Sequence, residues 1–215
     1  LNPIKDQKIY ANEYCHSLYV TCRVSENAAA GVYPVKIMFS YNEKTVIKKL
    51  NIKVLDCILP KQELAYTQWF HADCIADYYG LQVFSVEHWN MIEKFIETAA
   101  KTGINMILTP VFTPPLDTEI GHERTTVQLV DISLKNDTYT FGFEKLKKWI
   151  GICKKYGIES FEIAHLFTQW GTGKAPKIIV ETEKGKEKMF GWHTAALGTE
   201  YKTFLRRFLP ELVKF

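Results

Sequence analysis

The 215-residue chain lacks the features that mark several classes of protein. No apolar run approaches the ~20 residues that a membrane-spanning helix needs. Lys and Arg are spread along the chain and the formal net charge is only +3, whereas proteins that track phosphates concentrate their basic residues on one surface. We therefore expect neither a membrane segment nor a nucleic-acid partner.

The cysteines and the N-terminal residues give little support for a disulfide-bonded or secreted protein. The five cysteines are odd in number and form no C-x-x-C pair, which disfavours a disulfide framework and favours a reducing compartment. The first residues, LNPIKDQKIY, contain neither an initiator Met nor an apolar signal core. These observations predict a cytoplasmic protein and a chain that begins inside a longer one.

Three phosphate and acyl-transfer motifs are missing as well. The chain has no G-x-G-x-x-G loop, no P-loop and no G-x-S-x-G elbow. A doubly wound sheet stays open as an alternative fold, although it would lack the usual dinucleotide-binding loop. An acyl- or phosphate-handling enzyme is the function that we rank last.

The first sixty residues have the texture of β-structure. The segments VYPVKIMFS and TVIKKLNIKVL flank the turn YNEK, a pattern typical of a hairpin, and Tyr19 to Val24 alternates like a further strand. The last apolar run alternates polar and apolar residues, which indicates a sheet with one buried face. We interpret residues 1–58 as the C-terminal part of a β-sandwich domain, whose remaining strands lie upstream.

From residue 59 onward the pattern changes to strands that alternate with helices. Apolar strands are expected at 64–70, 104–109 and 159–164, and amphipathic helices from Ser85, from Phe143 and from Thr199. The joins AAKTGINMILT and CKKYGIESFEI each combine a helix end, a Gly and a strand. This repetition predicts an α/β fold with a parallel sheet. We expect residues 59–215 to form part of a (β/α)8 barrel, namely its first three βα units. An excursion over residues 168–198 should contain a hairpin that pairs 177–180 with 188–190.

Polar and aromatic residues gather where the three expected strands end, which is where barrels of this kind carry their chemistry. Aromatic rings beside acids, bases and amides suit a sugar, whose apolar faces stack on rings while its hydroxyls need donors and acceptors. The candidate binding residues are His71, Asp73, Asp117, Glu123, Arg124, His165, Gln169, Trp170 and Trp192.

Each candidate also has a simpler structural interpretation. A metal corner at His71-Ala72-Asp73-Cys74 has no second spaced His pair to support it, so we expect no metal and no cofactor. His165 follows a buried strand and is equally consistent with a hydrogen-bonded core imidazole. Glu123 and Arg124 could form an ion pair that holds the Pro-rich loop, and Trp170 and Trp192 could be packing residues.

Four long strings give the chain a resemblance to a known family. They are HADCIADYYGLQVFSVEHW, GINMILTPVFTPPLDTEIGHERTTVQLVD, FEIAHLFTQWGTGKAPKI and FGWHTAALGTEYKTFLRRFLPEL. They resemble the catalytic domain of glycoside hydrolase family 123, which comprises proteins similar to β-N-acetylgalactosaminidases. The preceding AAAGVYPVKIMF and LNIKVLDCILP are similar to the end of the β-sandwich before that family's barrel.

The resemblance implies a retaining, substrate-assisted hydrolase that cleaves terminal β-linked N-acetylhexosamine, with N-acetylgalactosamine the expected sugar. In that mechanism the acetamido carbonyl attacks the anomeric carbon, an Asp stabilises the oxazolinium and an adjacent Glu protonates the leaving oxygen. None of the seven Asp residues in this chain is followed by Glu.

We therefore carry over no catalytic residue and expect the Asp-Glu pair beyond residue 215. The chain is interpreted as a fragment of the enzyme that is inactive alone. The alternative is a carbohydrate-binding or structural module that has no catalysis.

Overall fold

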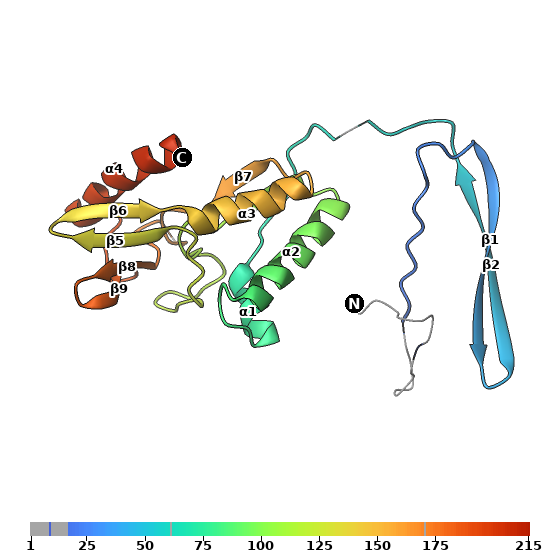
Figure 1. Cartoon of the computed structure of the whole chain (residues 1–215), viewed down its shortest axis with the longest axis horizontal. Coiled ribbons are helices and arrows are strands. Elements are labelled where there is room, and N and C mark those ends of the chain that lie inside the picture. Colours follow the sequence, from blue (N-terminus) through green and yellow to red (C-terminus); the bar gives the residue numbers. More distant parts are fainter. Residues whose placement is uncertain (1–8, 10–16, 61, 170) are drawn as a thin grey trace. The chain divides into compact units, whose positions relative to one another are not determined.

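A computed structural model describes residues 9, 17–60, 62–169 and 171–215 (Figure 1). The chain divides into two compact units, Leu1–Lys61 and Gln62–Phe215. No helix in these described ranges combines the length and the apolar character that a membrane crossing requires.

The first unit is built on one antiparallel hairpin. Strands β1 (Gly31–Tyr41) and β2 (Lys44–Val54) pair along their whole length. Asn42 and Glu43 form the turn with φ values of 42° and 64°, and two successive positive φ values match the right-handed twist of a hairpin. The predicted hairpin is thus confirmed, whereas the strand expected at Tyr19 to Val24 is wrong, because that segment pairs with neither β1 nor β2.

One face of this hairpin is apolar. Tyr33 lies opposite Ile52 and Phe39 lies opposite Val46, so aromatic and branched side chains pair across the strands as they do in stable sheets. Val46 nevertheless stays 54 % exposed. The hairpin alone does not bury this face, and the sandwich stays a prediction.

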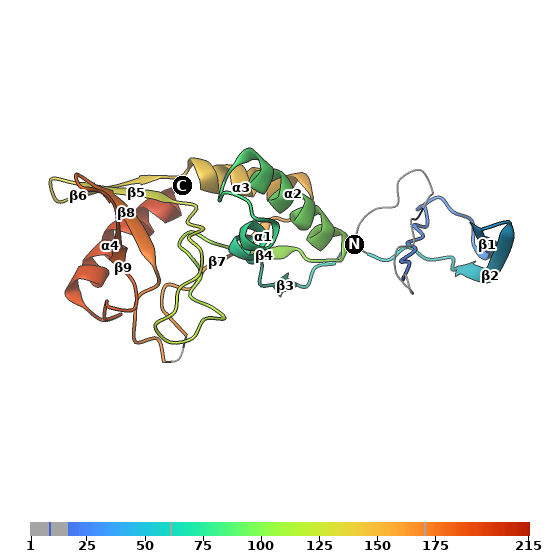
Figure 2. The same ribbon diagram turned by 90° about the horizontal axis from the view of Figure 1, so that it is seen from below.

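The second unit contains a three-stranded parallel sheet. Strands β3 (Thr67–Gln68), β4 (Met106–Thr109) and β7 (Ser160–Ile163) are ordered β3-β4-β7. Helices α2 (Val86–Lys101) and α3 (Glu144–Lys155) lie in the two connections and contact each other (Figures 1 and 2). The three predicted parallel strands and their helices are confirmed, although β3 is shorter than expected.

Local signals explain where these helices begin and end. The Ser85 hydroxyl accepts a hydrogen bond from the His88 backbone N–H at 3.2 Å and so caps α2. Gly103 and Gly157 follow α2 and α3 with φ values of 93° and 82°, a conformation that favours glycine. Both connections therefore turn back into the sheet in the same way.

Helix α1 (Ala72–Tyr79) was not predicted. Its sequence carries no helix-start signal, because His is not a favoured N-cap residue, and the His71 side chain makes no capping hydrogen bond. The helix ends at Gly80, whose φ is 62°. It buries Ala72, Ile75 and Ala76 in the core, so packing rather than capping stabilises it.

A second, four-stranded sheet forms from two excursions of the chain. Strands β5 (Asp131–Lys135) and β6 (Thr138–Gly142) precede α3, and β8 (Ile178–Thr182) and β9 (Gly185–Phe190) follow β7. Their order is β6-β5-β8-β9. The β8–β9 hairpin was predicted and is confirmed, whereas the β5–β6 hairpin was missed.

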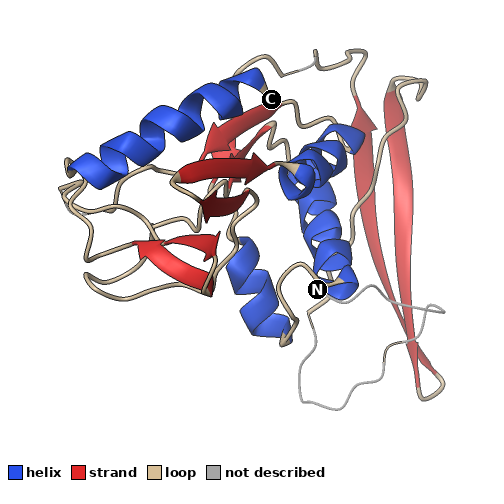
Figure 3. Ribbon diagram, turned by 60° about the vertical axis from the view of Figure 1, so that its left-hand side comes forward, coloured by secondary structure: helices blue, strands red, loops and turns tan. Residues whose placement is uncertain are grey.

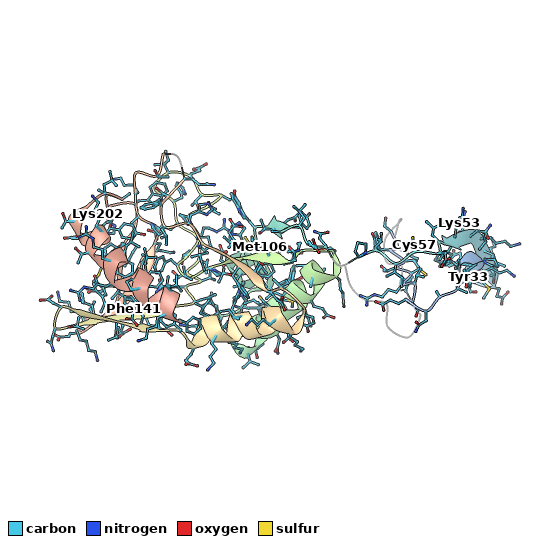
Figure 4. All side chains as sticks on the ribbon, turned by 90° about the horizontal axis from the view of Figure 1, so that it is seen from above. Tyr33, Lys53, Cys57, Met106, Phe141 and Lys202 are labelled. Carbon is cyan, nitrogen blue, oxygen red and sulfur yellow. The ribbon has the colours of Figure 1, made fainter. Side chains whose placement is uncertain are left out.

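Helix α4 (Thr199–Lys214) confirms the helix predicted from Thr199, and it packs on this four-stranded sheet. In Figure 3 it is the helix that leads to the C-terminus, and Figure 4 labels Phe141 of the sheet and Lys202 of the helix. The buried Phe204 ring contacts the rings of Tyr139, Phe141 and Phe190. Aromatic packing of this kind fixes the helix to the sheet.

In addition to the pairing of β5 with β8, the side chain of Gln128 connects the segment before β5 to β8. Gln128 Nε2 donates to the carbonyl oxygens of Val130 and Ile179, both at 2.9 Å. Gln128 Oε1 accepts from the Ile179 N–H at 2.9 Å. The segment before β5 is therefore held to β8 by an amide that satisfies backbone groups on both.

Candidate active site

The candidate site lies where the parallel strands end. Thr109 pairs with Ile163 in the ladder, and the Ala164 N–H donates to the Thr109 carbonyl at 3.0 Å. His71 and His165 follow β3 and β7 by a few residues. Because the strands are parallel and in register, the segments that follow them leave the sheet at one common edge.

A buried ion pair connects two of these segments. Arg124 Nε donates to Asp73 Oδ2 at 2.6 Å, with side chains that are 12 % and 3 % exposed. Arg124 Nη1 also donates to the Leu116 carbonyl at 3.1 Å. The guanidinium thus fixes the loop after β4 against the first turn of α1.

Asp117 links all three strand-end segments. Its Oδ2 lies 3.1 Å from His71 Nε2, and its backbone N–H donates to Gln169 Oε1 at 3.0 Å. The φ of Asp117 is 54°, in the left-handed region that Asp tolerates better than most residues. His71, Asp117 and Gln169 are therefore held together, as expected.

Two lysines that the sequence did not reveal complete the cluster. Glu123 Oε1 lies 2.5 Å from Lys188 Nζ, and its Oε2 lies 3.7 Å from Lys177 Nζ. The hydrogen bond from Lys188 lowers the pKa of Glu123. The pKa of Lys177 is lowered chiefly by burial. The ion pair considered between Glu123 and Arg124 is therefore wrong. Glu123 pairs with the two lysines, and Arg124 pairs with Asp73.

The remaining candidates are placed less centrally. Trp192 Nε1 donates to the His122 carbonyl at 2.8 Å. His165 is exposed, so it is no core imidazole, and its ring meets the ring of Trp69 edge-on at 5.8 Å. Trp69, which is 46 % exposed, is an aromatic residue that sequence reasoning missed. Trp170 lies outside the described residues.

Two atoms of the cluster are buried without a partner. Among the side chains that the structure describes, the buried polar atoms that lack a hydrogen bond are His71 Nδ1, Asp73 Oδ1 and Trp149 Nε1. Buried polar groups are satisfied in the great majority of cases. Burial, followed by the Arg124 charge, lowers the pKa of His71 despite the nearby carboxylates. His71 Nδ1 and Asp73 Oδ1 are therefore the described polar atoms of this cluster whose hydrogen-bonding capacity is unused.

The cluster encloses little space of its own. The cavity between Arg124, Lys177 and Trp192 measures about 20 Å³, which is room for one water molecule. Within the described parts of the chain, no group of three or more His, Cys, Asp or Glu side chains could hold a metal ion.

Comparison with known proteins gives this arrangement its context. The family model for the glycoside hydrolase 123 catalytic domain matches residues 69–215. No curated protein matches the chain significantly. The matched segment begins at Trp69, immediately after β3, and includes every candidate residue of the strand-end cluster. Because the match covers more than half of the chain, this protein belongs to the glycoside hydrolase 123 catalytic-domain family.

Proposed function

We propose that this chain is part of a retaining hydrolase that releases terminal β-linked N-acetylhexosamine, with N-acetylgalactosamine as the preferred sugar. Membership of a glycoside hydrolase family supports a carbohydrate substrate. The strand-end cluster is proposed to bind the sugar, and the resemblance of the four long strings supports the amino-sugar specificity.

The observation that carries the binding role is the pair of buried atoms without partners, His71 Nδ1 and Asp73 Oδ1. Asp73 Oδ1 accepts a hydrogen bond, and the neutral ring of His71 donates one or accepts one according to its tautomer. A sugar hydroxyl is both donor and acceptor, so it can satisfy either atom. Trp69 adds an exposed ring at the same edge, suited to the apolar face of a sugar.

The proposed mechanism is substrate-assisted. The acetamido carbonyl of the substrate attacks its own anomeric carbon, an Asp stabilises the oxazolinium, and a Glu protonates the leaving oxygen. Such a pair needs environments that keep one carboxyl ionised and the other protonated. No Asp in this chain is immediately followed by a Glu, so we assign binding roles and no catalytic role to its residues.

The fold proposal follows the same line. We propose that β3, β4 and β7 with α2 and α3 are the first units of a (β/α)8 barrel. Two features support it: the parallel order of the strands and the position of the polar cluster at their C-terminal ends, as in barrel enzymes. The β1–β2 hairpin is proposed to belong to a β-sandwich.

Binding of N-acetylgalactosamine to the purified chain tests the site. The variant His71→Phe keeps a ring and removes both nitrogens, so we expect affinity to fall about tenfold, the equivalent of one good hydrogen bond. Asp137→Asn at the β5–β6 turn is the matched control and should bind normally. Titration calorimetry measures both, beside galactose, which lacks the acetamido group. Equal affinity of a folded His71→Phe variant would remove this cluster from the proposal.

A further inference from the structure

A second cavity is lined by residues other than those of the strand-end cluster. It measures about 780 Å³ and is bordered by β5, β6, β8, the segment before α2 and the first turn of α3. Its volume is in the range of small-molecule sites, about 300–1,000 Å³. None of its lining residues belongs to the strand-end cluster.

One wall of this cavity is a row of polar side chains that crosses all four strands. Thr140 pairs with Ser133, Ser133 with Glu181, and Glu181 with Lys186. Paired residues point to the same face of a sheet, and this face is opposite the buried Ile132 and Val180. With strands spaced about 4.8 Å apart, the row is about 14 Å long.

The two hydroxyls of this row are hydrogen-bonded to each other. Ser133 Oγ and Thr140 Oγ1 lie 2.6 Å apart. Each hydroxyl has one proton and two lone pairs, so the pair keeps capacity for a further donor and acceptor. The row therefore offers alternating hydrogen-bonding groups along an extended line.

The charges around the cavity cancel. Lys145 pairs with Asp131, and Glu181 lies opposite Lys186 on the neighbouring strand. Two carboxylates face two ammonium groups, which removes the excess positive charge that a phosphate or nucleotide would need. A neutral, polar ligand fits this balance.

A second side of the cavity carries the Phe84 ring, with Lys145 Nζ 5.6 Å from the ring centroid. The Phe84 ring stacks on Trp89 with centroids 5.2 Å apart, and Ile179 lines the cavity beside the polar row. The φ of Phe84 is 60°, which is rare for a bulky residue and costs about 1–3 kcal/mol. Its N–H donates to His88 Nδ1 at 2.9 Å, and this bond helps to hold the strained position.

From these observations we infer that the cavity is a second binding site for a neutral oligosaccharide. The polar row forms hydrogen bonds with successive hydroxyls, and Phe84 and Ile179 contact the apolar edges of the sugar rings. The site needs no catalytic group, so it would hold a glycan chain on the protein independently of the strand-end cluster.

The test uses the full 215-residue chain and the neutral trisaccharide of β-1,4-linked N-acetylglucosamine, titrated by calorimetry. Thr140→Val keeps the side-chain shape and removes a hydroxyl, and Glu181→Ala removes the carboxylate in the middle of the row. We expect each to weaken the trisaccharide about tenfold. Lys135→Ala, on the same face of β5 but outside the cavity, is the matched control. Circular dichroism and melting curves establish that all variants are folded.

The strand-end variant His71→Phe separates this inference from the proposed function. Trisaccharide binding that survives His71→Phe and Lys135→Ala but falls in both cavity variants supports the second site. Trisaccharide binding that is lost only in His71→Phe overturns the second site. Binding that is equal in all variants, or no binding at millimolar trisaccharide, also overturns it. Tighter binding of inositol hexakisphosphate that depends on Lys186 would also overturn it, because the ligand would then be an anion.

Discussion

Arg124 and Asp73 form a buried ion pair between residues 51 positions apart in the sequence. Asp73 lies in the first turn of α1 and Arg124 in the loop after β4, so the pair joins two of the three segments at the strand ends. Removal of one partner leaves the other charge buried and uncompensated, which makes such pairs costly to break. The pair therefore anchors the candidate site.

Arg124→Leu is expected to lower the free energy of unfolding of the second unit by about 3–5 kcal/mol. Arg124→Lys should recover only part of the loss, because an ammonium group cannot reproduce the fork of bonds to Asp73 and Leu116. Urea denaturation followed by tryptophan fluorescence measures both. The exposed Arg206→Leu is the control, and a loss at Arg124 no larger than at Arg206 would contradict the anchoring role.

Acid should destabilise the second unit through His71. Burial lowers the pKa of His71 in the folded state, so between that value and about 6.5 the unfolded chain binds more protons. Stability contributed by the neutral ring is present above pH 6.5 or so and is lost as the pH falls through this window. The loss of stability is measured from the urea midpoints of the wild type and of His71→Phe at pH 7.5 and pH 5. An equal acid-induced loss in both proteins would assign the effect to other groups.

The isolated chain should not hydrolyse a chromogenic N-acetyl-β-galactosaminide. It has no adjacent Asp-Glu pair to hold the acetamide and protonate the leaving group, and general acid catalysis alone contributes about 10²–10⁴ in rate. The assay compares the chain with a version extended at its C-terminus. Turnover that is abolished by changing Asp73, Asp117, Glu123 or Glu162 to its amide would show that the catalytic site lies within this chain. Turnover that survives all four changes would indicate contamination.

Phe204→Ala should cost about 3–5 kcal/mol of stability, because it leaves a cavity among rings that cannot close in. Phe204 is fully buried and contacts rings from β6, β9 and Phe112. Lys202→Ala, an exposed change on the same helix, is the control and should have little effect. Thermal and urea unfolding compare the two, and a similar midpoint for both would contradict the role of α4 in holding the four-stranded sheet.

The sequence predicted the elements whose signals are local. INMILT is a short apolar run and IESFEI a mixed apolar and polar run; each follows a Gly and forms a parallel strand. The run KIIV and the turn at Gly185 predicted the β8–β9 hairpin for the same reason. The β5–β6 hairpin was missed although Asn136 and Asp137, both with positive φ, form a turn typical of hairpins. Its strands are largely polar on one face and did not show an apolar run.

The candidate site was predicted in part. Parallel strands bring their ends together, and so His71, Asp117 and Gln169 meet as expected. The partners of each charge could not be predicted, because Lys177 and Lys188 reach Glu123 from an excursion more than fifty residues away. Trp69 was taken as part of a strand, and only its exposure identifies it as a ring available to a ligand.

The Gln128 side chain connects the β5–β6 and β8–β9 hairpins through a single amide group. Its side-chain amide pairs with the N–H and the carbonyl of Ile179 in the way that the peptide group of a neighbouring strand would. The seam between the hairpins then depends on this amide and on the pairing of Ser133 with Glu181, three residues before the tips at Asn136 and Lys184. Either hairpin can be lengthened, shortened or replaced at its tip while the seam keeps its register. Changes at the hairpin tips are therefore expected to leave the parallel strands β3, β4 and β7 unaltered.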